Sequence, residues 1–541
     1  MQIIFTLMKR SFFLLYIFLI VTLFSCAKRG TITGGPKDTL APVIVNSYPK
    51  NFSTQFKGNE IKIVFNELIK VKDINKQLII SPPLKKQPII VPQGSASKFI
   101  SIKILDTLKE NTTYSFNFGK SIVDNNESNP YNQFKFVFST GNYIDSLSIA
   151  GKVKDSYLQK TENNISLLLY DAETFKDSMV YTNAPLYVSN TLDTLSVFSI
   201  ENIKEGKYKI IALKDANSNY KFDAKQDKIG FLKNAISVPT DTVYELEIFK
   251  EKLPFKALKP SQESKNKFYL PFEGEIENLK ISANQSSQEI PLKISRFPKP
   301  EKDTLQIFIP DNLKDSISFK IEANNYKKSF VSILKDLKEK DTLNIEAKQT
   351  NTLSFREQFT LNTSTPIKNI NNNNIKVQNK DSLYIPFTTV YNELLSEIEI
   401  NFLKEEKQNY TITLLPNAII DFYNKTNDTL MFNVKTKSLS DYGNLKVNLK
   451  NVKRYPVIVQ GLDSKGNVKI SKSSTKENVF VFDAIEPMLY TLRVIYDDNA
   501  NEEWDTGNYL EKKLPEEIIY LKKTVDVRAN WDVEQDFDLQ Q

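Results

Sequence analysis

YSFNF at residues 114–118 and FKFVF at residues 134–138 carry an aromatic residue at every second position. IKIVF at residues 61–65 shows the same alternation with Ile61, Ile63 and Phe65. Neighbouring side chains of a strand point to opposite faces, so each segment predicts a β-strand with one apolar face. Two such sheets bury their apolar faces against each other, which predicts a β-sandwich of about 100 residues here.

Alternating runs continue along the rest of the chain, around residues 305–321, 398–402 and 430–449. They predict an all-β fold class, with one short helix at residues 332–340. At 541 residues the chain is too long for one hydrophobic core. We therefore expect tandem β-sandwich domains, about four or five in number.

An internal repeat indicates that two of these domains are copies of one another. Eight residues recur at a constant offset of 282 positions without a gap, which predicts a shared fold. They are Phe198, Ile203, Tyr208, Asp215, Asn217, Asn219, Phe222 and Asp223, repeated as Phe480, Ile485, Tyr490, Asp497, Asn499, Asn501, Trp504 and Asp505. We assign the two copies to residues 143–252 and 454–541.

The amino terminus has the pattern of a secretory signal. Lys9 and Arg10 precede an apolar stretch at residues 12–24, which is shorter than the ~20 residues that span a bilayer. The segment LFSC ends at Cys26, the one cysteine of the chain, and resembles a bacterial lipobox. The resemblance implies a signal peptide at residues 1–25, diacylation of Cys26 and a flexible lipidated tether at residues 26–39. An ordinary signal peptide or an uncleaved anchor is the alternative.

Residues 40–142 resemble the bacterial Ig-like domain named after the S-layer protein SbsA. The matching segments are APVI at residues 41–44, YPKN at 48–51, FNE at 65–67, DNN at 124–126 and FVFSTG at 136–141. This resemblance implies a structural or adhesive module without catalytic residues. The two repeat copies resemble transthyretin-like or collagen-adhesin B-type sandwiches. Residues 253–350 are expected to form another β-sandwich, and residues 351–453 a β-rich domain that is a candidate second Ig-like copy.

The composition excludes several kinds of site. The chain has no histidine and one cysteine, so it cannot form a Ser-His-Asp triad, an intrachain disulfide or a thiolate zinc cluster. The formal net charge of +7 is too small for a chain of this length to indicate nucleic-acid binding.

The repeated loop has the pattern DxNxNxxxD, which resembles the first half of a calcium-binding loop. Tyr220 and Glu502 stand where such a loop has its glycine, and Gln226 and Asn508 replace its terminal acid. The alternative is a turn closed by Asp and Asn side chains without an ion. The candidate Ca²⁺ ligands are Asp215, Asn217, Asn219 and Asp223 in one copy, and Asp497, Asn499, Asn501 and Asp505 in the other.

Adjacent carboxylates occur as Glu502-Glu503 and Glu516-Glu517. A carboxylate-based hydrolase needs two acids that converge on one substrate, whereas neighbours on a strand point to opposite faces. We therefore expect these acids to be solvated charges rather than catalytic groups.

Together these observations favour a non-enzymatic, lipid-anchored envelope protein that acts as a scaffold or binds a partner. By resemblance to other lipoproteins, Ala27 after the cysteine implies the outer membrane, and Lys28 and Arg29 favour its periplasmic face. The expected partners are the membrane and an envelope protein or glycan. The first alternative is a polysaccharide-binding or transport-accessory lipoprotein, and the second is a carboxylate-based hydrolase.

Overall fold

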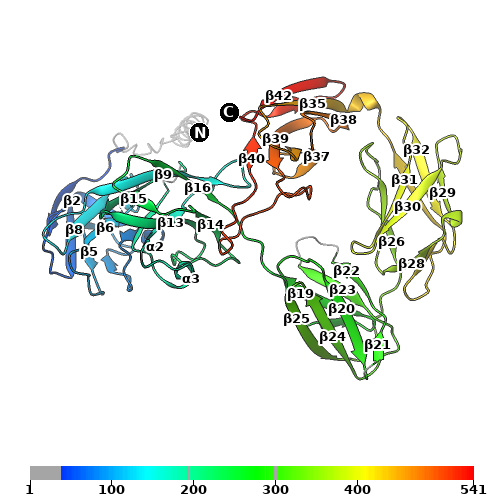
Figure 1. Ribbon diagram of the computed structural model, residues 1–541, viewed down its shortest axis with the longest axis horizontal. Coiled ribbons are helices and arrows are strands. Elements are labelled where there is room, and N and C mark those ends of the chain that lie inside the picture. Colours follow the sequence, from blue (N-terminus) through cyan, green and yellow to red (C-terminus); the bar gives the residue numbers. More distant parts are fainter. Residues whose placement is uncertain (1–37, 192–194, 287, 298–302, 541) are drawn as a thin grey trace, which may run out of the picture. The chain divides into compact units, whose positions relative to one another are not determined.

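The computed structural model describes residues 38–191, 195–286, 288–297 and 303–540. The chain divides into two compact units, unit 1 (Met1–Asp145) and unit 2 (Ser146–Gln541). Strands make up nearly half of the described residues and helices only a few of them (Figure 1), which confirms the all-β class. The apolar stretch at residues 12–24 and the predicted lipidation site at Cys26 lie outside the described residues. Within the described part, no helix is long and apolar enough to cross a membrane.

Unit 1 is a sandwich of two antiparallel sheets. Alternating residues of the predicted strands, including Ile61, Ile63, Phe116 and Phe138, are fully buried between them. One sheet has the order β1 (Ile44–Tyr48), β2 (Glu60–Val71), β5 (Ser97–Lys103), β4 (Ile89–Val91), with β7 (Ile122–Asp124) also paired to β2, and the other has the order β3 (Ile79–Ser81), β6 (Thr113–Asn117), β8 (Lys135–Ser139). A short helix, α2 (Ile74–Gln77), precedes β3.

The first repeat copy, residues 147–248, opens unit 2. Its strand β9 (Leu147–Asp155) pairs in parallel with its last strand, β16 (Val243–Ile248), and a separate hydrophobic cluster lies between the two sheets. Its sheets have the orders β12 (Val197–Ile203), β9 (Leu147–Asp155), β16 (Val243–Ile248) and β11 (Tyr187–Asn190), β10 (Ser166–Asp171), β13 (Gly206–Lys214), β14 (Lys228–Phe231), with β15 (Ile236–Val238) on β13. Helix α3 (Met179–Thr182) lies between β10 and β11.

The second repeat copy, residues 443–538, has the same strand order. Its sheets are β38 (Val479–Ile485), β35 (Gly443–Lys450), β42 (Asp532–Asp538) and β37 (Val468–Ser474), β36 (Val457–Leu462), β39 (Met488–Tyr496), β40 (Ile518–Tyr520), with β41 (Val525–Val527) on β39. Strand β35 pairs in parallel with β42, as β9 pairs with β16. The repeat seen in eight residues therefore extends over a whole sandwich.

One strand lies in a different domain from the one predicted. The alternating run that contains Leu445, Val447 and Leu449 falls within residues 351–453, the range predicted for the preceding domain. It forms β35, which pairs with β38 and β42 and packs into the core of the second copy. Alternation shows that a segment is a half-buried strand but does not identify its partner strand.

Two further sandwiches lie between the copies, each with its own hydrophobic cluster. The first contains β17 (Lys256–Ala257), β18 (Ser261–Ser264), β19 (Lys267–Glu273), β20 (Lys280–Gln285), β21 (Gln288–Ile290), β22 (Lys293–Arg296), β23 (Thr304–Phe308), β24 (Ser316–Ala323) and β25 (Tyr326–Ile333). The second contains β26 (Ile345–Ala347), β27 (Phe359–Thr363), β28 (Ile367–Ile370), β29 (Ile375–Gln378), β30 (Phe387–Asn392), β31 (Glu397–Phe402), β32 (Asn409–Leu414), β33 (Ile419–Asp421) and β34 (Leu430–Lys435), with 3-10 turns η1 (Asn372–Asn374) and η2 (Leu439–Asp441).

The helix predicted at residues 332–340 is absent from the structure described here. Strand β25 extends to Ile333, and its eight residues pair in register with β24, from Ala323 opposite Tyr326 to Ser316 opposite Ile333. Residues 334–340 contain no helix. The long ladder with β24 outweighs the weak local helical preference.

Candidate functional site

The loop of the first repeat copy is closed by its own acidic and amide side chains. The carboxylate of Asp215 accepts the backbone N–H groups of Asn217 at 3.1 Å and Tyr220 at 2.7 Å. Asn219 Oδ1 accepts the N–H of Lys221, and Asp223 Oδ1 accepts that of Lys225. Burial raises the pKa of Asp215 although these N–H groups favour its ionised form.

The second copy repeats much of this pattern. Asp497 accepts the N–H of Glu502 at 2.9 Å, as Asp215 accepts that of Tyr220, and Asn501 accepts the N–H of Glu503. Tyr220 and Glu502 have φ angles of 57° and 64°, in the left-handed region. Tyr220 and Glu502, which stand at the glycine position of a calcium loop, thus share one left-handed backbone conformation. The backbone N–H of each residue donates to the first aspartate of its loop, which stabilises this conformation.

The eight predicted ligands thus lie in two equivalent loops, where they bond mainly to nearby backbone or side-chain groups. Asp505 differs from its counterpart, because its carboxylate accepts from Asn501 Nδ2 at 3.0 Å and from Lys252 Nζ at 3.2 Å. Within the described ranges, no group of three or more Asp, Glu, His or Cys residues is arranged to hold a metal ion. The geometry is that of a turn, and calcium binding remains a prediction.

A buried carboxylate bridges the two ends of each loop. In the first copy, Asp227 accepts the N–H groups of Ala216 at 2.9 Å and Asp223 at 2.8 Å. In the second copy, Glu516 accepts those of Asp498 at 2.7 Å and Asp505 at 2.9 Å. These are the same two backbone positions at the 282-residue offset, so Asp227 and Glu516 perform the same structural role.

The position of Glu516 corrects one prediction. This residue was expected to be a solvated charge, yet it is 5% exposed. Burial raises the pKa of its carboxyl group against the lowering effect of the two N–H groups. Its neighbour Glu517 instead pairs with Lys453 and Arg454. The two adjacent acids therefore have separate partners, and Glu502 accepts the Ser473 hydroxyl at 2.8 Å.

The second copy carries seven additional residues after its loop. Asp223 corresponds to Asp505 at an offset of 282, whereas Val238, which pairs with Gly206, corresponds to Val527, which pairs with Met488, at an offset of 289. The difference lies between Asp505 and Glu516. We call residues 506–515 the inserted segment.

The inserted segment lies against the first repeat copy. Tyr509 is 1% exposed, its N–H donates to Glu251 Oε1 at 2.5 Å and its hydroxyl donates to Asp177 Oδ1 at 3.0 Å. The Thr506 hydroxyl donates to the Lys250 carbonyl at 2.7 Å, and Lys512 Nζ contacts Asp177 at 2.6 Å. Several polar contacts thus join segments more than 250 residues apart in the sequence.

Aromatic and charged groups reinforce this contact. The Tyr509 ring lies 5.4 Å from that of Phe231, edge to face, and Lys512 Nζ lies 3.8 Å above the Tyr509 ring. Burial raises the pKa of Tyr509, and the nearby Asp177 carboxylate adds to the shift. Partial burial raises the pKa of Asp177, but bonds from Lys512 and Tyr509 outweigh it and lower the pKa overall.

A second contact between the copies is built around Tyr157. The Arg493 guanidinium, in a residue 2% exposed, lies 4.4 Å from the Tyr157 ring centre and donates to its hydroxyl at 3.0 Å. The Tyr520 hydroxyl donates to the Tyr157 carbonyl at 2.6 Å. The ring of Trp504, at the end of the second loop, packs 4.8 Å from Tyr157. Trp504 therefore packs across the interface between the copies.

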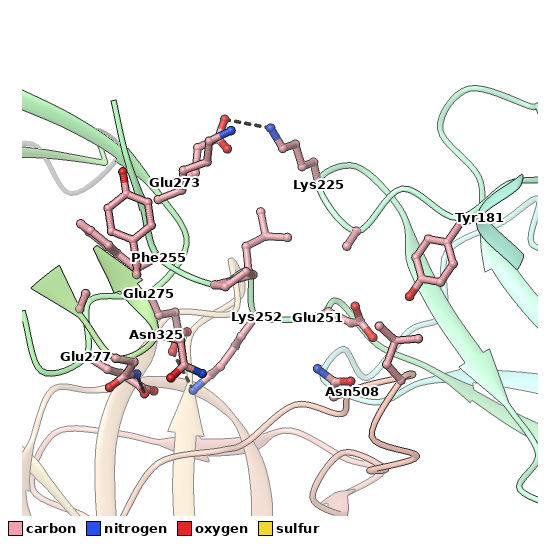
Figure 2. A pocket seen from close by; sticks show the side chains of 18 residues that line it. Tyr181, Lys225, Glu251, Lys252, Phe255, Glu273, Glu275, Glu277, Asn325 and Asn508 are labelled. Carbon is pink, nitrogen blue, oxygen red and sulfur yellow. Dashed lines mark hydrogen bonds and ion pairs between the residues drawn. The ribbon is translucent and has the colours of Figure 1, made fainter. Parts of the chain in front are cut away.

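A cavity of about 930 Å³ lies beside the inserted segment. Its wall includes Tyr181, Phe255 and Tyr326, the amides of Asn325 and Asn508, and several glutamates. Figure 2 shows Tyr181, Glu251 and Asn508 on one side and Phe255 and Glu273 on the other. Two ion pairs, Lys225–Glu273 at 2.9 Å and Lys252–Glu275 at 3.1 Å, neutralise part of its acidic lining. Burial, with the nearby Glu251 and Asp177, raises the pKa of Tyr181 to about 12.

Residues 38–140 match the bacterial Ig-like domain family, so the chain contains such a domain there. No curated protein matches the chain.

Among solved structures, surface layer protein SbsC (domains 1–6) is 12% identical, with 90% of this chain and 67% of that chain covered and a TM-score of 0.15. The Bacillus anthracis TIE protein is 11% identical, with 93% and 76% covered and a TM-score of 0.14. A Bacteroides ovatus glucan-utilisation protein, SGBP-B, is 9% identical, with 68% and 89% covered and a TM-score of 0.18. At these identities and TM-scores, the similarities do not indicate a function.

Proposed function

We propose that this chain is a non-catalytic, lipid-anchored protein of the bacterial cell envelope whose tandem sandwiches act as a scaffold. The observation that carries the proposal is the position of Cys26, the one cysteine of the chain, directly after a basic and apolar leader. Two or more acyl chains on one residue give stable membrane attachment.

The described residues support a scaffold role. Each of the five sandwiches has its own cluster of buried apolar residues, which supplies a core of its own. The inserted segment joins the first and second repeat copies by contacts that include a buried tyrosine. Such contacts would restrict the movement of the two sandwiches between the copies.

The anchor is tested by fractionating cells that express Cys26→Ser. We expect the wild-type chain in the membrane fraction with a mass increase from acyl groups, and the variant in the soluble fraction. Lys28→Ala is the matched control, because it changes a residue near the anchor and retains the thiol. An unmodified Cys26 thiol on the mature protein would contradict the proposal.

We place the protein on the periplasmic face of the outer membrane. Protease added to intact cells should then leave it undigested until the outer membrane is permeabilised. Digestion in intact cells would place it on the cell surface instead.

The cavity beside the inserted segment favours polysaccharide binding as the second candidate function. Ligand cavities commonly lie between domains and combine aromatic walls with a few polar groups, as this one does. A glycan array with the Cys26→Ser protein tests this function. Binding that is lost in Tyr181→Ala and retained in Tyr143→Ala, a change at an exposed tyrosine of unit 1, would support it.

A further inference from the structure

One face of unit 1 carries large apolar side chains that the sandwich core does not use. In the sheet of β1, β2, β5 and β4, Tyr48 lies opposite Lys62, and Lys62 lies opposite Ser101. Ser101 in turn lies opposite Val91 on β4. Because Ile61 and Ile63 point into the core, this row points outward.

The neighbouring rows add further apolar groups to the same face. Val64 lies opposite Phe99, and Lys103 lies opposite Ile89. Tyr48 is 60% exposed, Ile89 49%, Val91 48% and Phe99 40%. These four large, exposed apolar residues share one face of the sheet and form an apolar patch. Exposed apolar patches often mark interaction surfaces. We call this patch the outer face of unit 1.

Positive charge is interspersed among these apolar groups. Lys62 Nζ lies 4.3 Å above the Phe99 ring. Lys103 lies between Glu60 and Ile89, in the row next to that of Lys62 and Ser101. The acid on the face, Glu60, accepts the Ser101 hydroxyl at 2.8 Å. Residues 38–145 contain 13 lysines and no arginine against nine Asp and Glu residues, so unit 1 has a positive net charge.

The chain enters unit 1 beside this face. Val43 and Asn66 exchange two hydrogen bonds, of 2.7 and 3.0 Å, at the start of edge strand β1. Val43, Val45 and Leu68 around this point are themselves exposed. Eleven residues separate Cys26 from Asp38, and even a fully extended chain of that length spans only about 40 Å.

We infer that the outer face of unit 1 rests on a phospholipid surface, with the aromatic and aliphatic side chains among the headgroups and the lysines on anionic lipids. The inference rests on the proposed lipid anchor, which would hold unit 1 within reach of the bilayer. Amphipathic tyrosines and lysines are the side chains suited to the headgroup layer. The lipid anchor would keep unit 1 at a high local concentration near the bilayer, so that even weak contacts with lipid headgroups would be occupied.

The single thiol allows a direct test on the chain that begins at Cys26. Coupling Cys26 to a maleimide lipid in vesicles of phosphatidylethanolamine and phosphatidylglycerol supplies an anchor without cellular acylation. Lysine acetylation rates, measured by mass spectrometry, are then compared between coupled and free protein. We expect Lys62 and Lys103 to be acetylated about fivefold more slowly in the coupled protein than in the free protein. On vesicles without phosphatidylglycerol, this slowing should be smaller.

Lys328 is the matched internal control, because it is also exposed and lies 4.8 Å above an aromatic ring, that of Phe330, in unit 2. Its rate should not change on coupling. The double variant Tyr48→Ser and Phe99→Ser should abolish the protection of Lys62 and Lys103. Val331→Ser with Ile333→Ser, two exposed positions on β25, should preserve it.

Several outcomes would overturn the inference. These are unchanged rates at Lys62 and Lys103 on coupling, equal protection of Lys328, or protection that survives the double variant in unit 1. Protection that appears only at high protein density would assign the face to a second copy of the chain. None of these outcomes bears on cellular acylation, which the fractionation of Cys26→Ser tests separately.

Discussion

At the scale of single residues, buried carboxylates organise the loops of this protein. Asp227 is 0% exposed and each of its oxygens accepts one backbone N–H. In unit 1, Asp124 has the same kind of role and accepts four N–H groups from residues 126–129. Burial alone would raise the pKa of Asp124, but these N–H groups outweigh it and lower the pKa. Fixed partners of this kind stabilise a loop without a metal ion.

Replacing Asp227 by Asn is expected to destabilise the first repeat copy by about 1–3 kcal/mol, because one backbone N–H loses its acceptor in a buried site. Glu516→Gln should have a comparable effect on the second copy. Glu503→Gln, at an exposed position in the same loop, should change stability by less than about 0.5 kcal/mol. Chemical denaturation measures all three, and equal effects of Glu516→Gln and Glu503→Gln would argue against the bridging role.

Calcium is expected to leave the thermal midpoint of the protein unchanged, because the loop carboxylates already accept hydrogen bonds. Calorimetric titration with calcium checks this expectation for the wild-type chain and for Asp215→Ala. Heat of binding that disappears in Asp215→Ala would instead establish the calcium site predicted from the DxNxNxxxD pattern.

At the scale of elements, the inserted segment distinguishes the two repeat copies. Tyr509 fills a site made by residues of the first copy, whereas Leu510 beside it is 62% exposed and lines the cavity. The second copy therefore reaches its partner sandwich through one additional loop as well as through Arg493 on β39 and Tyr520 on β40. Deleting or loosening this loop should leave both cores intact.

Tyr509→Ala is expected to release the inserted segment from the first repeat copy, because it removes the ring beside Phe231 and the hydroxyl bonded to Asp177. Limited proteolysis within residues 506–515 should become faster, while thermal unfolding of each sandwich changes little. Glu511→Gln, an exposed neighbour, is the control. Unaltered proteolysis in Tyr509→Ala would contradict the proposed contact.

Acidification should weaken the same contact. The folded pKa of Asp177 lies below its ordinary value of 3.8, because its bonds to Lys512 and Tyr509 outweigh partial burial. Its stabilisation is therefore complete at neutral pH and is lost as the pH falls below about 3.8 through the folded pKa. Proteolysis of the inserted segment by an acid-active protease, compared with Asp177→Asn, measures this. Asp177→Asn should remove the part of the pH dependence that Asp177 contributes.

At the scale of the whole molecule, the two units have separate cores. Phe138 is fully buried in unit 1, where its ring lies 4.4 Å from that of Phe56. Trp504 and Trp531, the two tryptophans of the chain, both lie in unit 2. Tryptophan fluorescence therefore reports the unfolding of unit 2.

Phe138→Ala is expected to destabilise unit 1 by about 3–5 kcal/mol, the usual cost of removing a buried phenylalanine. The calorimetric transition of unit 1 should move to lower temperature while the tryptophan fluorescence transition stays in place. Phe482→Ala, in the core of the second repeat copy, should shift the fluorescence transition. A common shift of both signals in Phe138→Ala would show that the units unfold together.

Unit 1 and the sandwich of β26–β34 form a second repeat, which the alternation of apolar residues alone does not reveal. The Tyr114 hydroxyl accepts the N–H of Lys109, and the Tyr410 hydroxyl accepts that of Glu405, 296 residues later. Thr140 and Thr436 correspond at the same offset and accept the N–H groups of Thr112 and Gln408. The strand pairing of β26, β27, β31 and β30 follows that of β1, β2, β5 and β4. A search for tyrosine and threonine at this spacing would have found the correspondence.

The all-β class, the aromatic faces of residues 114–118 and 134–138, and the repeat from Phe198 to Asp223 are readable from the chain alone, because alternation and recurrence are local properties. The membership of β35 in the second repeat copy, the burial of Glu516 and the site that Tyr509 fills on the first copy are visible only in the folded chain. These features depend on which distant segments meet. When a charged or aromatic side chain is buried at such a contact, the sequence around it carries no pattern that indicates the burial.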